Sequence, residues 1–547
     1  MKDPKFPQLT PRQVKTLRDY GTVEHFTERT TVFKVGDTSY DFNVVLSGSI
    51  DIVDPANQDN LITTHHKNGF SGDSSMLSSR AANVIGYANP DTYLLRIKQD
   101  KLKEAISRHS EISDVLLNAF LLRQEAVLAD YQGGSKVLGS GNSKETYNIL
   151  DFLDKNHIWY TFLDTDSSQE AKDLLEHFHI TELDLPLLMN DEQEIYIKPS
   201  IEQIARCTGV LTEFEDKVFD VCVVGAGPAG LAASVYAASE GLSVVTIDNK
   251  APGGQAGKSS KIENYLGFPT GISGSDLANR AYIQAQKFGC TISIPHTAEK
   301  LEHRNNEFWL CATNGKQIRS RTIIIATGAS YRRLPVDGIE KYEGSGVYYS
   351  ATGMNINNCR DATVGIVGGG NSAGQAALFL AKYAKEVKIM IRGGDLGAKM
   401  SDYLVQRIEA AENIQVKYYC EVSKLSGEHH LEAIHVTVKD GSSETIEMNN
   451  LFTFVGAAPC TEWMEDVVVT DNRGFICTGE ALRDHDLSEH AIYQKRRPLQ
   501  LETSIPGLFA VGDVRNGSTK RVASAVGEGS ICISQIHQVL EELHKLQ

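Results

Sequence analysis

The sequence predicts a multidomain protein in which a β-rich barrel and a small α/β domain precede two larger α/β domains. Three observations support this prediction. The chain has 547 residues, which is too long for a single hydrophobic core. Residues 1–131 alternate short β-branched runs with glycines, as strands and turns do. The order strand, glycine-rich turn, helix then occurs twice between residues 219 and 383.

The composition is that of a globular protein, with 41% apolar and 23% charged residues. The formal net charge of −16 argues against nucleic acid or an anionic membrane surface as a partner, because both would repel the chain. The N-terminus lacks the apolar core of a signal peptide and no apolar run spans a bilayer, so we expect a cytoplasmic protein without a membrane partner. The nine cysteines show no metal-ligand spacing and no CxxC pair, so no metal site is expected.

Within the β-rich unit, a loop of small residues departs from the strand pattern. It carries Gly72 and Asp73, followed by Arg80 and Ala81. Backbone N–H groups near Gly72 and the Arg80 guanidinium suit a phosphate, and Asp73 can accept a hydrogen bond from a ribose hydroxyl.

This loop resembles the phosphate cassette of the cyclic nucleotide-binding domain, in which Phe-Gly-Glu is followed by Arg-Ala-Ala. The matching residues occur in the same order, with Ser71 inserted and aspartate in place of glutamate: Phe70, Gly72, Asp73, Arg80, Ala81 and Ala82. The resemblance implies this fold for residues 1–131 and a cyclic nucleotide as a candidate ligand. The alternative is a docking or scaffold domain that keeps only the shape.

Residues 132–214 are predicted to form the small α/β domain. Its first residues, 132–142, contain four glycines and are expected to be a linker. A helix, a strand, a second helix and a strand preceded by Pro186 follow, which resembles the thioredoxin or glutaredoxin fold. Where that family has its dithiol, before the first helix, this chain reads SGNSKET without a cysteine. We therefore expect a packing or recognition module without thiol chemistry.

The first of the two larger units begins with a β-branched run that ends in GAGPAG, residues 225–230. Gly225 allows the tight turn, Gly227 lets the backbone approach a pyrophosphate, and Gly230 allows close packing of helix on strand. Pro228 and Ala229 open the helix, whose free N–H groups face an anion. The next strand ends at Asp248, where an acid can bind a ribose hydroxyl, so this Rossmann-like unit is predicted to bind a dinucleotide.

Further segments around this unit favour FAD as its dinucleotide. Gln255 and Asn264 are polar groups that can meet a flavin ring or its ribityl chain, and Asp513 can accept from a ribityl hydroxyl. The helix that starts near Ala523 directs its N–H groups toward the side of a flavin that gains electron density on reduction. The other residues predicted to bind FAD lie beside these groups: Gly254, Ala326, Thr327, Gly328, Gly512, Arg521 and Val522.

The second glycine turn, GGGNSA, predicts a second dinucleotide site of the same Rossmann-like type. Its next strand ends at Ile391 and Arg392, with no acid where an NAD site has one. An arginine can bind a 2′-phosphate, so NADPH is expected. The residues predicted to bind it are Gly368, Gly370, Asn371, Ser372, Ala373, Arg392 and Gly456.

In order and spacing, these motifs resemble the low-molecular-weight thioredoxin reductases, which are pyridine nucleotide-disulfide oxidoreductases. The resemblance covers residues 215–547. It implies an FAD domain made of residues 215–333 and 460–547, an NADPH domain inserted at 334–459, and a homodimer.

The chain departs from that family at its redox-active dithiol. Ser350 and Gly353 stand at the two cysteine positions, so the two thiols that take electrons from the flavin in that family are missing. Three interpretations remain open. In the first, reduced flavin passes electrons directly to a quinone, oxygen or a small redox protein; the ferredoxin–NADP reductases of this fold also lack the dithiol. In the second, another cysteine reduces a disulfide acceptor, and Cys359 is the nearest. In the third, the chain is a regulatory flavoprotein that senses nucleotides and turns over little.

Overall fold

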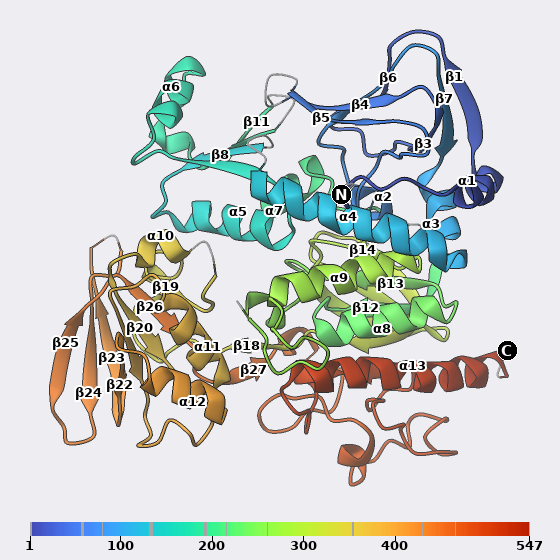
Figure 1. Cartoon of the computed structure of the whole chain (residues 1–547). Helices are drawn as coiled ribbons and strands as arrows, with labels where there is room; N and C mark the ends of the chain where they lie inside the picture. Colours follow the sequence, from blue (N-terminus) through green and yellow to red (C-terminus); the bar gives the residue numbers. More distant parts are fainter. Residues whose placement is uncertain are drawn as a thin grey trace.

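The structure is a computed structural model that describes residues 3–545, except 56–59, 79, 131–134, 191–193, 215, 260, 353–354, 429 and 465. Four parts follow one another along the chain (Figure 1). The barrel-like first domain and the small second domain lie on one side of the central α/β domain. The inserted α/β domain lies at its end, and the C-terminal helix covers the opposite face.

The first domain is the β-rich unit that the sequence predicts. It has two antiparallel sheets, with the strand orders β1-β7-β3 and β2-β6-β4-β5. Phe42 and Phe70 on the inner side pack against Phe120 of the long helix α4. The elements are α1 Pro11–Leu17, β1 Thr22–Phe26, β2 Thr30–Phe33, β3 Phe42–Ser47, β4 Ile50–Asp54, β5 Asn60–His65, α2 Ser75–Ser78, β6 Ile85–Ala88, β7 Thr92–Ile97, α3 Gln99–Arg108 and α4 Ser110–Asp130.

The second domain is a four-stranded sheet of order β11-β10-β8-β9, in which β8 and β9 are parallel and β10 is antiparallel to its neighbours. The Leu185–Pro186 peptide before β10 is cis. The elements are β8 Ser135–Gly139, α5 Lys144–Lys155, β9 Tyr160–Asp164, α6 Gln169–His177, β10 Leu187–Met189, β11 Ile195–Ile197 and α7 Ile201–Cys207.

The linker predicted at residues 132–142 is wrong over its central part. Residues 135–139 form β8, because Val137 and Leu138 are buried between β9 and β10. The glycines that suggested a linker flank this strand or end it. Residues 131–134 lie outside the described part of the chain.

The central domain is built on a largely parallel sheet of order β14-β13-β12-β17-β16-β15, with β28 pairing with β17. Its buried strands are nearly continuous apolar runs, as parallel strands covered on both faces require. β17 ends at Ile325, so residues 326–328 form a loop at the carboxyl end of the strand. The elements are β12 Val218–Val224, α8 Pro228–Ser239, β13 Val244–Ile247, α9 Gly274–Lys287, β14 Thr291–Ser293, β15 Ala298–Arg304, β16 Glu307–Ala312, β17 Gln317–Ile325, β28 Leu508–Ala510 and α13 Val522–His544.

The inserted domain has a parallel sheet of order β19-β26-β20-β21-β22 and a small antiparallel sheet, β23-β24-β25. Two strands, β18 and β27, pair where the chain enters and leaves this domain. The elements are β18 Ala329–Tyr331, β19 Val347–Tyr348, α10 Ile356–Cys359, β20 Thr363–Val367, α11 Asn371–Leu380, β21 Glu386–Met390, α12 Asp402–Glu409, β22 Ile414–Lys417, β23 Cys420–Ser426, β24 Ala433–Val438, β25 Ser443–Glu447, β26 Asn450–Thr453 and β27 Ala457–Pro459.

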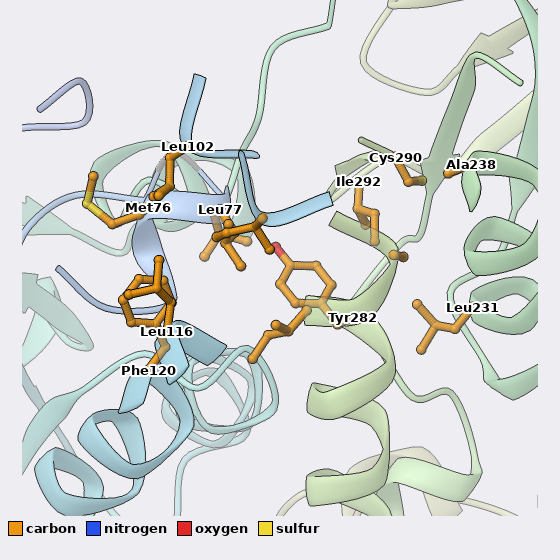
Figure 2. Packing of buried hydrophobic residues seen from close by; sticks show 14 of the residues in the cluster. Met76, Leu77, Leu102, Leu116, Phe120, Leu231, Ala238, Tyr282, Cys290 and Ile292 are labelled. Atoms are coloured by element: carbon orange, nitrogen blue, oxygen red, sulfur yellow. The ribbon is translucent and has the colours of Figure 1, made fainter. Parts of the chain in front are cut away.

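One hydrophobic cluster runs through the first, second and central domains. Figure 2 shows the contact between the first domain and the central domain, where Tyr282 projects from α9 toward Leu77. Leu116 and Phe120 lie on one side of Tyr282, and Leu231 and Ile292 lie on the other. The first domain is therefore packed onto the central one over an apolar contact. None of the helices in the described ranges is both long and apolar enough to cross a lipid bilayer.

Candidate functional site

A cavity of about 1950 Å³ runs between the central and inserted domains. It opens at the carboxyl ends of the parallel strands, where open α/β sheets bind their ligands. Among its lining residues are all of those predicted for the two dinucleotides except Gly230. Residues distant in sequence, such as Gly225, Arg392 and Asp513, thus share one cavity.

The first glycine turn has the geometry that its sequence predicts. Gly225 has φ 109°, in the region that favours glycine. A Cβ on Gly230 would overlap the Gly225 carbonyl oxygen, so Gly230 serves helix packing and does not line the cavity. A Cβ on Gly227 would have only the Gly254 Cα nearby, at 3.9 Å. Gly227 therefore leaves space at the N-terminus of α8 for a ligand.

Asp248 braces this turn from the end of β13. Its carboxylate accepts hydrogen bonds from the N–H groups of Ala226 at 2.8 Å, Lys250 at 2.9 Å and Ala251 at 3.1 Å. Burial raises the pKa of the carboxyl, and these three bonds act in the opposite direction. Asp248, predicted to bind a ribose hydroxyl, therefore has a second role: it joins the two loops that border the cavity. Its distance in sequence from the glycine turn did not indicate this role.

The residues around this turn fit a flavin dinucleotide. Gln255 lines the cavity with a buried Oε1 atom that has no hydrogen-bond partner among the described residues. Asn264 lines the same region, and the N-termini of α8 and α13 both border it. A ligand with hydrogen-bond donors and a pyrophosphate would satisfy the Gln255 oxygen and the free N–H groups together.

A half-buried acid on α13, Glu528, joins the residues of the C-terminal part of the site. It accepts from the Gly512 N–H at 2.7 Å and pairs with Arg515 at 2.6 Å. Burial and the nearby Glu528 charge raise the pKa of Asp513. Sequence reasoning missed Glu528; its position between Gly527 and Gly529, in an otherwise apolar part of the helix, was the available signal.

The second glycine turn has the same form in the inserted domain. Gly368 has φ 139°, and a Cβ there would lie 2.7 Å from the Phe454 carbonyl oxygen. Nothing lies within 4 Å of a Cβ built on Gly370, which leaves space before α11. The Asn371 side chain accepts from the Ser401 N–H, and Ser372 accepts from the Tyr331 hydroxyl at 2.6 Å.

Arg392 lies at the rim of the cavity, as expected for a residue that binds a 2′-phosphate. Its side chain is 80% exposed, and its guanidinium is 3.7 Å from Glu421. Lys399 lines the same end of the cavity and was not predicted. Two cations are therefore available for a phosphate at this end.

Of the two positions of the missing dithiol, Ser350 is buried and is not among the described residues that line the cavity. Gly353 lies outside the described residues. Cys359 is fully buried in the core of the inserted domain, and burial raises its pKa to about 12. The structure does not bring Cys359 to the cavity, and its thiol has the character of an inert core residue. Two other cysteines, Cys420 and Cys460, do line the cavity, and burial raises both of their pKa values.

Of the residues predicted for a cyclic nucleotide, Arg80 and Ala81 contact the second domain, whereas Gly72 lies inside the first domain. Arg80 donates to the Asn156 carbonyl oxygen at 2.8 Å, and a Cβ built on Gly209 would lie 3.0 Å from the Ala81 nitrogen. Asp73 accepts from the Ser75 N–H, and the Gly72 carbonyl accepts from Arg123. A cavity of about 260 Å³ remains between the two domains, lined by Asp73, Arg80 and Ala81 but not by Gly72.

Two glycine turns, each following a strand of a parallel sheet, border one cavity. Residues 219–529 match the family described as pyridine nucleotide-disulphide oxidoreductase. The thioredoxin reductases of Listeria monocytogenes and Bacillus subtilis are 32% and 29% identical to the chain, over 60% of it and 96% and 98% of their own lengths. Solved thioredoxin reductases from Lactococcus lactis and T. acidophilum each give a TM-score of 0.53, at 28% and 29% identity, over 59% of this chain and 99% of theirs.

The chain therefore belongs to the pyridine nucleotide-disulphide oxidoreductase family and is thioredoxin reductase-like over about 60% of its length. It is an FAD-dependent NADPH oxidoreductase, and FAD and NADPH are confirmed as its cofactors at the level of the family.

Proposed function

We propose that the chain transfers hydride from NADPH to FAD and passes the electrons directly to an acceptor, without a dithiol. One observation carries this proposal: both glycine turns border one cavity, whereas Ser350 has no thiol and lies outside that cavity. When bound, FAD supplies the hydride acceptor and the store of two electrons.

The residues have separate roles in this proposal. The turn at residues 225–230 and the Gln255 amide hold FAD, with Asp248 and Asp513 beside its hydroxyl groups. The N-terminus of α13 stabilises negative charge that develops on the flavin. The turn at residues 368–373 holds NADPH, and Arg392 and Lys399 bind its 2′-phosphate. Within the FAD domain, Asp248 and Glu528 accept hydrogen bonds from the loops that border the cavity, which holds the groups that would contact FAD in position.

The acceptor of the electrons is expected to be a quinone, oxygen or a small redox protein. A disulfide acceptor would need a thiolate near the flavin, and burial raises the pKa of both cysteines that line the cavity. Direct transfer from the flavin needs no such group.

The test is stopped-flow reduction of the purified holoprotein by NADPH, followed by reoxidation with a panel of acceptors. We expect the flavin spectrum to bleach with NADPH and to return with a quinone, oxygen or a small electron carrier. Thioredoxin with dithionitrobenzoate should give no turnover. A protein that binds no FAD would contradict the whole proposal, and a flavin that NADPH reduces but no acceptor reoxidises would favour a regulatory flavoprotein instead.

We further propose that the second domain is thioredoxin-like and that the first is a docking domain of cyclic nucleotide-binding shape. The order β8, α5, β9, α6, β10, β11, α7 supports the first proposal, with Ser143 at the N-cap of α5 where a dithiol would stand. The contacts of Arg80 and Ala81 with the second domain favour docking over nucleotide binding. A cytoplasmic homodimer is the expected form of the whole protein.

A further inference from the structure

Helix α5 of the second domain contacts the FAD domain, the NADPH domain and the first domain (Figure 1). We propose that α5 holds the NADPH domain in position against the FAD domain and thereby sets the rate at which NADPH reduces the flavin. This inference rests on the proposed function, because it concerns how the two cofactor domains meet.

The N-terminal turns of α5 face the NADPH domain. The Tyr147 ring lies 5.6 Å from the Tyr348 ring, and its hydroxyl interacts with the Asn355 side chain. The Lys144 ammonium lies 3.7 Å from a carboxylate oxygen of Glu343. These contacts surround the segment that carries Ser350.

Glu343 is a fixed partner for Lys144 because its carboxylate is itself held by two residues, Tyr349 of the NADPH domain and Arg333 at the point where the chain enters that domain. Arg333 donates to it at 2.9 Å, and the Tyr349 hydroxyl donates at 2.7 Å. The residue is only 9% exposed. The Lys144 ammonium therefore meets a carboxylate in a set orientation, unlike most surface ion pairs.

The C-terminal turns of α5 face the FAD domain. The Asp151 carboxylate is buried and lies 2.5 Å from both the Lys155 and the Lys250 ammonium groups. Burial raises the pKa of this carboxyl, but the two lysines hold it below its ordinary value. Lys155 also lines the large cavity. At the C-cap, the Asn156 amide donates to the Lys250 carbonyl oxygen at 2.9 Å.

The hydrophobic contacts of α5 are also divided between the two cofactor domains. Ile149, Phe152 and Leu153 belong to the cluster shared with the FAD domain, whereas Tyr147 packs against the core of the NADPH domain. Among the described residues, none of the clusters contains core residues from both cofactor domains. The two domains therefore have separate cores, and α5 contributes side chains to both.

Among the described residues, few other contacts fix the two cofactor domains to each other. The chain crosses between them at β18 and β27, where the Tyr331 hydroxyl donates to Ser372 at 2.6 Å. Arg407 of the NADPH domain pairs with Glu263 of the FAD domain at 2.6 Å. Hydride transfer needs the reacting atoms at roughly 3–3.5 Å, and a displacement of about 1 Å can cost a hundredfold in rate. Loosening the α5 contact should therefore slow flavin reduction without removing either cofactor.

The test uses the full-length holoprotein with the double substitution Lys144→Glu and Tyr147→Phe. The new acid faces Glu343, and loss of the hydroxyl removes the interaction with Asn355, while the ring that packs against the core of the NADPH domain remains. Lys136→Glu is the matched control, because Lys136 pairs with Glu170 inside the second domain. Three quantities are measured: flavin reduction by NADPH, flavin reduction by dithionite, and hydrogen exchange of residues 343–352.

We expect the rate constant with NADPH to fall about tenfold and exchange at 343–352 to increase, with dithionite reduction and FAD content unchanged. Lys136→Glu should behave as the wild type. An unchanged or faster reduction by NADPH would overturn the inference, as would unchanged exchange at 343–352. If NADPH fails to reduce the wild type, the proposed function fails instead, and the exchange measurement still tests the contact. Tyr147→Phe alone keeps the volume of the ring, so it should not unfold the helix. It should lower the rate constant with NADPH and raise the exchange at 343–352 by smaller amounts than the double substitution.

Discussion

Glu528 of α13 accepts a hydrogen bond of 2.7 Å from the Gly512 N–H and so ties the C-terminal helix to the turn after β28. The same carboxylate pairs with Arg515 and accepts from Ser518. It is largely buried, so the arginine is the group that compensates its charge. The N-terminus of α13 and the Asp513 carboxylate are held at the cavity through this one side chain.

Glu528→Gln should weaken FAD binding while the fold persists. Glutamine can still accept from the Gly512 N–H, but the bond loses its charge assistance, which roughly halves its strength. We expect the dissociation constant for FAD to rise about tenfold, which corresponds to about 1.4 kcal/mol. Fluorescence titration of the apoprotein with FAD measures it. Glu541→Gln, on an exposed part of the same helix, is the control, and equal affinities in both variants would contradict the role.

Arg392→Ala should raise the Michaelis constant for NADPH more than tenfold and that for NADH far less. Only NADPH carries the 2′-phosphate, and a neutral side chain removes a charge-assisted bond to it. Lys399→Ala should act in the same direction with a smaller effect. Initial-rate kinetics with both nucleotides give the answer, and equal effects on the two Michaelis constants would show that Arg392 does not bind the 2′-phosphate.

Arg80→Ala should destabilise the contact between the first and second domains without affecting any nucleotide response. A hydrogen bond from a charged donor contributes about 1.5–3 kcal/mol, so the melting temperature should fall by roughly 5 °C. Arg29→Ala, at an exposed ion pair of the first domain, is the control. Cyclic AMP and cyclic GMP should leave the wild-type melting temperature unchanged. A nucleotide-dependent increase that Arg80→Ala abolishes would instead establish the cyclic nucleotide site.

The sequence predicted the parts of the site that depend on local backbone geometry. Gly225 and Gly368 must adopt positive φ, and that requirement is visible in the glycine spacing itself. The contact between Tyr147 and Tyr348 joins residues far apart along the chain, so no local pattern indicates it. The strand at residues 135–139 was missed for a related reason. Its glycines suggested a loop, whereas pairing with β9 and β10 decides its conformation.

Lys258 should make FAD binding depend on pH. Burial, reinforced by Lys155 and Lys250, lowers the pKa of the Lys258 ammonium, which lines the FAD cavity, to about 8. The charge that attracts an anionic ligand is therefore complete well below pH 8 and is lost as the pH rises through 8. We expect the affinity of the apoprotein for FAD to decrease severalfold between pH 7 and pH 9.5. Lys258→Met should remove this dependence. Lys250→Met should move it to higher pH, because one of the charges that lower the pKa of Lys258 is then lost. Titrations of the apoprotein with FAD across that pH range measure both effects.

Restoring the dithiol with Ser350→Cys and Gly353→Cys should not produce a thioredoxin reductase. A dithiol that reduces another protein must be reached by it, and Ser350 is only 6% exposed. The neighbouring residues Tyr348 and Asn355 are covered by Tyr147 of α5. We expect thioredoxin-dependent reduction of dithionitrobenzoate to stay at background, and alkylation at position 350 to require denaturation. Adding Lys144→Glu and Tyr147→Phe should speed this alkylation, since it loosens the cover. Robust turnover of thioredoxin by the dithiol variant alone would show that the second domain leaves this position open.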